Sequence, residues 1–159
     1  MEIEELYNQN YVYLKNFLIH LTKDGDLADD IIQELFSKIL LQPKVLMNVK
    51  YMKSWLVKGA KNTLIDYYRK KKPDLFNDEN IIESMLISHH SPESNSLIQA
   101  QIEDVLSKLS PTDKAIILAK EYYGYKYEEI SELLDIPIPT LKSRVLRMKK
   151  RLLKEERER

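Results

Sequence analysis

A run of basic residues near the C-terminus is the strongest chemical signal in the sequence. Between Lys142 and Lys154 there are seven lysine and arginine residues and no acidic residue. At about 100° per residue, one side of a helix here carries Leu141, Val145, Met148 and Leu152. The other side carries Thr140, Ser143, Arg144, Arg147, Arg151 and Lys154. A helix held down by an apolar face, with guanidinium groups opposite, suits reading of the DNA major groove, and a solvated basic surface helix is the alternative.

A second chemical cluster lies on a helix that we expect over residues 50–72. Its apolar stripe consists of Leu56, Val57, Ala60, Leu64 and Tyr67. The opposite side carries Trp55, Lys58, Lys61, Asn62, Asp66 and Arg69. Cations that follow phosphates, beside an indole that stacks on an unpaired base, suit a single nucleic-acid strand. The alternative is that Trp55 packs against the first helix while the lysines are merely solvated.

Catalytic groups at motif spacing are missing from the sequence. There is no cysteine, which excludes disulfides, thiolate zinc sites and cysteine nucleophiles. The histidines are His20, His89 and His90, and the adjacent pair has no carboxylate or nucleophile at motif spacing. Because a glycine-rich phosphate loop is also missing, we expect no enzyme activity, no cofactor and no metal.

A shorter helix must position the basic one. Residues 127–134 have helical apolar spacing, and only residues 135–138 separate them from the helix expected over 139–155. Pro139 suits a first helical position, because its missing N–H is not needed there. Two short helices joined by a tight turn indicate a helix-turn-helix.

Helical apolar spacing also dominates the rest of the chain. We expect helices over residues 3–22, 96–108 and 111–123, and another that Pro43 ends, with Asp26 and Asp29 as its capping pair. Only three glycines and 43% apolar residues accompany these long stretches, so we predict an all-α fold.

Charge divides the chain into three parts, although the formal net charge is zero. Residues 1–72 carry 12 basic and 9 acidic residues, and residues 97–159 carry 13 and 11. Residues 73–96 carry five acids and no lysine or arginine. We therefore predict two small helical domains, 1–72 and 97–159, joined by a flexible acidic linker over 73–96. Within the linker, Ile81, Ile82, Met85, Leu86 and Ile87 allow one short helical turn.

The N-terminus lacks the basic and apolar regions of a signal peptide. No apolar run reaches the roughly 20 residues that span a bilayer. We expect a cytoplasmic protein.

Three segments resemble, in the right order, the RNA polymerase sigma factors of the extracytoplasmic-function type. Residues 26–36 are similar to that family's core-polymerase-binding segment, and residues 51–72 to the segment that binds and melts the −10 element. Residues 106–111, 127–130 and 140–144 are similar to the −35-binding domain. A single helix-turn-helix is shared by many regulators, whereas these segments cover nearly the whole chain.

The resemblance implies a subunit that binds core polymerase, recognises two promoter elements and helps to open the duplex. It assigns contact with the β′ clamp helices to Asp30, Gln33, Glu34, Phe36 and Leu40. It assigns the melted −10 strand to Trp55, Lys58, Lys61, Asn62, Asp66 and Arg69. It assigns the −35 duplex to Thr140, Lys142, Ser143, Arg144, Arg147 and Arg151.

The family also implies a contact with the polymerase β flap and an inhibitory anti-sigma partner. Leu146 and Leu153 lie seven residues apart and off the main apolar stripe, so they are candidates for the flap contact. A second contact within the domain is the alternative for this pair.

Three residues depart from the family pattern around the helix-turn-helix. Lys126 stands where a serine or threonine often caps the first helix, which removes a side-chain acceptor worth about 1 kcal/mol. Asp135 and Pro139 replace frequent glycines, although aspartate tolerates left-handed geometry better than most residues. These two replacements are candidates for tilting the reading helix and altering promoter preference.

Linker length restricts how the two domains work together. A free chain of 24 residues has a root-mean-square span of ~27 Å and reaches ~80 Å when fully extended. The two promoter elements that the family implies lie about two helical turns apart, roughly 70 Å. The domains therefore cannot hold both elements while they are packed together, and a closed packing is a natural inactive state.

A stand-alone helix-turn-helix regulator with an N-terminal dimerisation domain is the second hypothesis. Trp55 with its basic face and the cluster of Asp30, Gln33 and Glu34 argue against it, because dimerisation requires neither feature.

Overall fold

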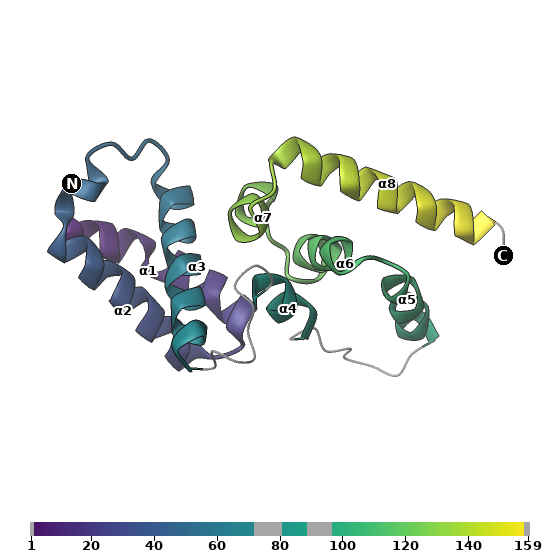
Figure 1. Cartoon of the computed structure of the whole chain (residues 1–159), viewed down its shortest axis with the longest axis horizontal. Helices are drawn as coiled ribbons and strands as arrows, with labels where there is room; N and C mark the ends of the chain where they lie inside the picture. The colour runs from purple at the N-terminus through teal and green to yellow at the C-terminus, as the bar shows by residue number, and fades with distance from the viewer. Residues whose placement is uncertain (1, 72–80, 89–96, 158–159) are drawn as a thin grey trace. The chain divides into compact units, whose positions relative to one another are not determined.

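A computed structural model describes residues 2–71, 81–88 and 97–157, and in these ranges the chain is helical and contains no strand (Figure 1). The prediction of an all-α fold is therefore confirmed. The chain forms two compact units, residues 1–82 and 83–159, and each is described by itself.

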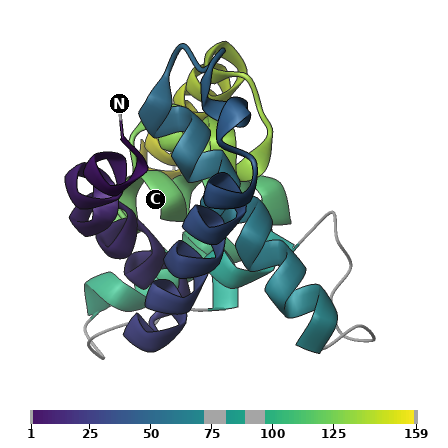
Figure 2. The ribbon, with the colours of Figure 1, turned by 90° about the vertical axis from the view of Figure 1, so that its left-hand side faces the viewer.

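The first unit is a bundle of three helices, which Figures 1 and 2 show side by side. These are α1 (Ile3–Thr22), α2 (Gly25–Leu41) and α3 (Met52–Lys71), with a short 3₁₀ helix, η1 (Pro43–Leu46), between the last two. Their fully buried aliphatic side chains include Leu14, Leu18, Leu21, Ile31, Ile32, Leu56 and Leu64. Each such burial contributes about 1.5–3 kcal/mol before side-chain entropy is considered.

Local features fix the turns of this bundle. Lys23 ends α1 in the left-handed conformation, with φ 58°, and its N–H donates to the Ile19 carbonyl. Asp24 caps α2 by accepting a hydrogen bond from Leu27 N at 3.1 Å. The predicted capping pair of Asp26 and Asp29 was wrong, because both residues already lie inside the helix. Gly59 lets α3 approach α2 closely, since a Cβ there would lie 2.8 Å from Leu35 Cδ1.

Among the described residues, the second unit contains four complete helices and most of α4 (Ile81–Ser88), whose Ile81 and Ile82 belong to the first unit. The others are α5 (Leu97–Ser107), α6 (Pro111–Ile117), α7 (Tyr127–Leu134) and α8 (Ile138–Arg157), and a π-helical turn, η2 (Leu118–Tyr122), continues α6. Ser110 caps α6 by accepting from Asp113 N at 3.2 Å. The buried core includes Ala115, Ile116, Ala119, Ile130 and Leu133.

The predicted stripe of α8 is largely buried. Leu141, Val145 and Met148 are 0%, 3% and 2% exposed, and Leu152 is half-buried. Asp135 adopts the left-handed conformation at the α7–α8 turn, with φ 56° and ψ 42°, and Ser131 Oγ donates to the Ile136 carbonyl at 2.7 Å. Together these features form the predicted helix-turn-helix.

The segment predicted as a linker contains the helix α4. The short turn expected there is an eight-residue helix whose Ile81, Ile82, Met85 and Leu86 side chains are buried. Residues 72–80 and 89–96, the latter including His89 and His90, lie outside the described residues. The flexibility of the linker and the exact domain boundaries therefore stay predictions.

Candidate nucleic-acid and polymerase interfaces

The outward face of α8 presents most of the residues predicted to read duplex DNA. The exposed ones are Thr140, Lys142, Ser143, Arg147 and Arg151. Lys142 Nζ lies 5.7 Å from the Tyr127 ring centroid, a cation–π contact that ties the start of α8 to α7. The buried stripe opposite fixes this face outward, so several cationic donors project from one rigid helix.

Arg144 differs from the other arginines of α8. Its Nη1 lies 3.3 Å from Asp113 Oδ1 on α6, and the two side chains are 33% and 26% exposed. Asp113 is the third residue of α6, and Ser110 caps its backbone N–H. The ion pair therefore joins α8 to α6, which the helical projection did not predict. Arg144 has fewer donors available for DNA than Arg147.

The N-terminus of α7 is capped in an unpredicted way. Lys126 N donates to Glu129 Oε1 at 2.8 Å, so the glutamate satisfies the backbone N–H of Lys126, a different donor from the one that a serine or threonine at position 126 would satisfy. The departure at Lys126 is thus partly compensated, and the two helices of the motif keep their local geometry.

The predicted strand-binding face of α3 is only partly exposed. Lys58, Asn62 and Arg69 are exposed and Trp55 is half-buried. Asp66 pairs with Arg69, with Oδ1 and Nη1 3.2 Å apart, which lowers the net positive charge at that end of the helix.

Lys61 departs from the predicted arrangement. It is 3% exposed, and its side chain interacts within the protein. The placement of Lys61 on the exposed face was wrong, because it follows Val57 by one helical turn and lies beside the core stripe. A direct contact with DNA would require this side chain to leave its site.

Exposed apolar residues between α2 and α3 form a surface that the sequence reasoning missed. Leu41, Val45, Met47 and Tyr51 are 82%, 42%, 78% and 68% exposed, and they run from the last residue of α2 through η1 to the residue before α3. Lys50 Nζ lies 5.5 Å from the Tyr51 ring centroid. In the sequence, this surface could have been predicted from four apolar residues around Pro43 that lack helical spacing.

The acidic face of α2 is exposed as predicted. Asp30, Gln33 and Glu34 lie on the surface, and Leu40 is 62% exposed. Phe36 is 4% exposed, and its ring packs edge-on against Tyr7, with centroids 5.1 Å apart. The assignment of Phe36 as a polymerase contact is therefore corrected: it belongs to the core, on the side of α2 opposite Glu34.

An ion pair orients α2 on α1. Asp29 accepts hydrogen bonds from Tyr11 Oη at 2.5 Å and from Lys15 Nζ at 3.1 Å. Both hydrogen bonds hold the pKa of the Asp29 carboxyl below its usual value, and the bond from Tyr11 has the larger effect. The hydrogen bond to Asp29 in turn raises the pKa of both Tyr11 and Lys15. Asp29 precedes the exposed Asp30 directly, so this cluster sets the rotation of the acidic face.

We predict that Asp29→Asn lowers the stability of the protein at neutral pH. The stability of this variant should then fall less steeply as the pH is lowered. A carboxyl whose pKa is lowered in the folded state stabilises the fold at pH values above its unfolded pKa, near 3.8. This contribution is lost as the pH falls through the folded pKa. Thermal unfolding midpoints between pH 7 and pH 2 measure the effect. Asp30→Asn is the matched control, and equal pH profiles for the two variants would contradict the prediction.

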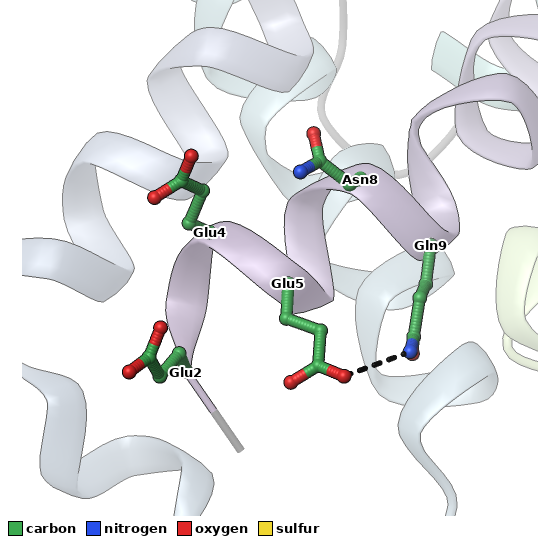
Figure 3. Close-up of a pocket in the computed structure, with 5 residues that line it drawn as sticks. All are labelled: Glu2, Glu4, Glu5, Asn8 and Gln9. Atoms are coloured by element: carbon green, nitrogen blue, oxygen red, sulfur yellow. Dashed lines mark hydrogen bonds between the residues drawn. The ribbon is translucent and has the colours of Figure 1, made fainter.

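A shallow concavity lies on the first turns of α1 (Figure 3). It is lined by Glu2, Glu4, Glu5, Asn8 and Gln9. Gln9 Nε2 donates to Glu5 Oε1 at 3.4 Å, one helical turn away. Its carboxylates would repel phosphates, so this surface does not extend either basic face.

Two further properties concern the described residues alone. None of their helices is long and apolar enough to cross a bilayer. They also contain no group of three or more histidine, aspartate or glutamate side chains placed to hold a metal ion.

The fold and its surfaces define a helical DNA-binding protein with a C-terminal helix-turn-helix and a separate N-terminal three-helix unit. Comparison with known families also divides the chain in two, and the boundary at residues 82/83 lies in the gap between the two matches. Residues 6–73 match the model for sigma-70 region 2, and residues 99–152 match the model for sigma-70 region 4.

Characterised relatives match over most of their length. RNA polymerase sigma factor SigZ of Bacillus subtilis is 29% identical over 150 residues, covering 92% of this chain and 82% of the relative. The extracytoplasmic-function (ECF) sigma factor SigM of the same organism is 28% identical over 153 residues, covering 96% and 93%. ECF sigma factor SigL of Mycobacterium tuberculosis is 27% identical over 147 residues, covering 88% and 80%. The chain belongs to the sigma-70 family, among its ECF members.

This membership confirms the function suggested by the resemblance and disfavours the stand-alone regulator. The protein is a promoter-directing sigma factor. The sigma factor family is not a class of catalytic enzymes.

Proposed function

We propose that this sigma factor divides its work among three faces of the two units: α2 binds the β′ clamp helices, α3 holds the melted −10 strand, and α8 reads the −35 duplex. The observation that carries the proposal is the separate exposure of an acidic face on α2 and basic faces on α3 and α8. Clamp binding would use Asp30, Gln33, Glu34 and Leu40.

On α8, the exposed guanidinium and hydroxyl groups are the base and phosphate contacts. Arg147 and Arg151 lie one helical turn apart on the exposed face, which suits a helix inserted into the major groove. Arg144 acts mainly as a clamp between α8 and α6 through Asp113. It would reach a phosphate only with the donors that Asp113 leaves available.

On α3, we assign the melted strand to Trp55, Lys58 and Asn62. The exposed apolar residues around η1, ending at Tyr51, would take an unstacked base, because apolar and aromatic side chains bind base faces without a charge penalty. Arg69 would contact phosphate, with Asp66 orienting its guanidinium group.

The remaining partners follow from exposed side chains and the family. Leu146 and Leu153 are 55% and 56% exposed, which supports a contact with a partner over the intradomain contact considered as an alternative. We propose that they meet the β flap, and that an anti-sigma protein competes for the same faces. We place the protein in the cytoplasm, where it would meet the polymerase and promoter DNA.

Run-off transcription with core polymerase on a genomic promoter library tests the proposal. We expect transcripts from promoters that share one −10 and one −35 sequence. A chain that is not retained by core polymerase at moderate salt, or that directs no promoter-specific transcript, would contradict it.

We predict that Glu34→Lys weakens core binding about tenfold or more. The substitution reverses a charge on the exposed face of α2, and like charges brought together at an interface are strongly unfavourable. The lost pair with Lys38, at 3.9 Å and exposed, contributes little to folding. Competition with another sigma factor for core polymerase measures the change.

The matched control is Glu5→Lys, an equal charge reversal on α1 outside the proposed interface. We expect this variant to compete like the original chain. If Glu34→Lys also competes normally, α2 does not bind polymerase through this face.

A further inference from the structure

Arg144 lies at the edge of the face of α8 that we assign to DNA. It is one helical turn from both Thr140 and Arg147, and two turns from Arg151, so these four residues occupy neighbouring positions on the helix surface. The other three are exposed, whereas the Arg144 guanidinium group is directed to Asp113 on α6, with Nη1 and Oδ1 3.3 Å apart. The protein itself therefore holds one of the cations of this face.

Asp113 is fixed in place by the first turn of α6. Its backbone N–H donates to Ser110 Oγ at 3.2 Å, and a carboxylate in the first turn of a helix is favoured by the helix dipole. The preceding residue, Thr112, donates to the Glu83 carboxylate of α4 at 3.1 Å, which ties the same turn to a second helix. The Asp113 carboxylate therefore reaches α8 from a turn that is anchored independently of Arg144.

The pair between Asp113 and Arg144 is suited to compete with a phosphate group. It joins single atoms of two side chains that are 33% and 26% exposed, and partly exposed ion pairs are weak. In the part of the chain that the structure describes, Asp113 is the acidic side chain that pairs with Arg144. A guanidinium group has five N–H donors in a planar fork that matches phosphate. Without the Asp113 carboxylate, this fork would be available to the DNA backbone.

An additional phosphate contact would favour incorrect sequences over the promoter. Phosphate contacts carry no sequence information and supply most of the non-specific affinity for DNA. On the correct element, base contacts from Arg147 and Arg151 would fix the register of α8. On any other sequence, α8 can shift until a released guanidinium group meets a phosphate. A negative charge that occupies Arg144 and repels the backbone opposes such binding.

We propose that Asp113 is a positioning residue that holds Arg144 away from the DNA backbone and thereby limits binding of this sigma factor to DNA without a promoter. The inference rests on the proposed function, because it takes α8 as the helix that reads the −35 duplex. It adds a residue of α6, outside the helix-turn-helix, to the determinants of promoter choice.

The variant Asp113→Asn tests the proposal, because it removes the charge and keeps the shape of the side chain. Binding of the full chain, assembled with core polymerase, is measured on a duplex with the −35 element and on one with that element scrambled. We expect affinity for the scrambled duplex to rise about fivefold and affinity for the intact one to rise less than about twofold. The plot of log affinity against log salt should steepen by about 0.9, the value for one added phosphate contact.

The variant Glu121→Gln is the matched control for the change in net charge. It removes a carboxylate that pairs with Lys149 of α8 at 3.8 Å, where both side chains are 58% exposed. We expect its affinities to stay within about twofold of the original on both duplexes, because so exposed a pair withholds little from solvent. The variant Asp113→Glu keeps the charge and should restore the original preference.

A second variant isolates the guanidinium group. In a chain with Arg144→Gln, adding Asp113→Asn should change the affinities no more than Glu121→Gln does, because no guanidinium group is left to release. A role of Asp113 in folding alone would instead lower affinity for both duplexes, with the salt dependence unchanged.

The outcomes separate this inference from the proposed function. Unchanged or lower affinity of Asp113→Asn for the scrambled duplex would overturn the role of Asp113, as would an equal effect of Asp113→Asn with and without Arg144. If the original chain with core polymerase does not distinguish the intact duplex from the scrambled one, the assignment of α8 to the −35 element is wrong instead.

Discussion

Replacing Arg147 by alanine is expected to reduce transcription from −35-dependent promoters roughly 10- to 100-fold, because a bidentate contact between arginine and a base edge contributes about 1–3 kcal/mol. Arg147 lies on the exposed face of α8, one turn before Arg151 and opposite the buried Val145 and Met148. Removing its guanidinium group should leave the fold unchanged. Run-off transcription on promoters with an intact or a scrambled −35 element measures the loss, which should vanish on the scrambled element.

Arg144 is the matched control, since it lies on the same helix but pairs with Asp113 on α6. We expect Arg144→Ala to lower stability by at most about 1 kcal/mol and to affect DNA sequence preference less than Arg147→Ala. Arg147→Ala should retain normal binding to core polymerase. Loss of polymerase binding, or equal defects on intact and scrambled elements, would contradict the assignment of Arg147 to the −35 duplex.

The helix-turn-helix could be predicted from the sequence because its determinants are local. Apolar spacing alone predicted the extent of α7 and the buried face of α8, and the left-handed residue of the turn is Asp135, which the sequence singled out. Each of these features depends on residues within a few positions of one another. Side-chain partners from distant helices did not enter these predictions.

The sequence analysis misplaced some residues for a different reason, which is tertiary packing. A helical projection assigned Lys61 to the polar face, yet the side of α3 that is covered extends beyond the apolar stripe. Phe36 was assigned to an interface although Tyr7, 29 positions earlier, packs against its ring. The Arg144–Asp113 pair likewise joins residues 31 positions apart. Such pairs depend on how helices dock, which a single sequence does not specify.

The docked α4 shows what composition alone could not predict about residues 81–88. Pro73 and Pro92, the polar residues and the five acids favoured an unstructured segment, and a run of only eight residues is too short for a stable free helix. The missing stabilisation comes from Tyr123 and Thr112, which belong to another part of the chain.

Trp55→Ala is expected to slow promoter opening roughly 10- to 100-fold while leaving closed-complex binding within about twofold. Stacking of one base on an aromatic side chain contributes about 1–3 kcal/mol, and this contact exists only after the duplex has melted. Trp55 is half-buried in the first turn of α3, beside the exposed Lys58 and close in sequence to the apolar residues that end at Tyr51. A base that leaves the stack would therefore meet an indole, a cation and an apolar surface together.

A promoter with a pre-melted −10 region separates this role from a structural one. If Trp55 acts by holding the melted strand against reannealing, Trp55→Ala should open duplex DNA slowly yet initiate at near-normal rate on the pre-melted template, and Trp55→Phe should recover part of the rate. If Trp55 only supports the packing of α3, the variant should lose thermal stability and core binding. Its defect in initiation should then be equal on both templates. A normal opening rate on duplex DNA would exclude Trp55 from opening altogether and leave Asn62 and the residues around η1 as the strand-binding groups.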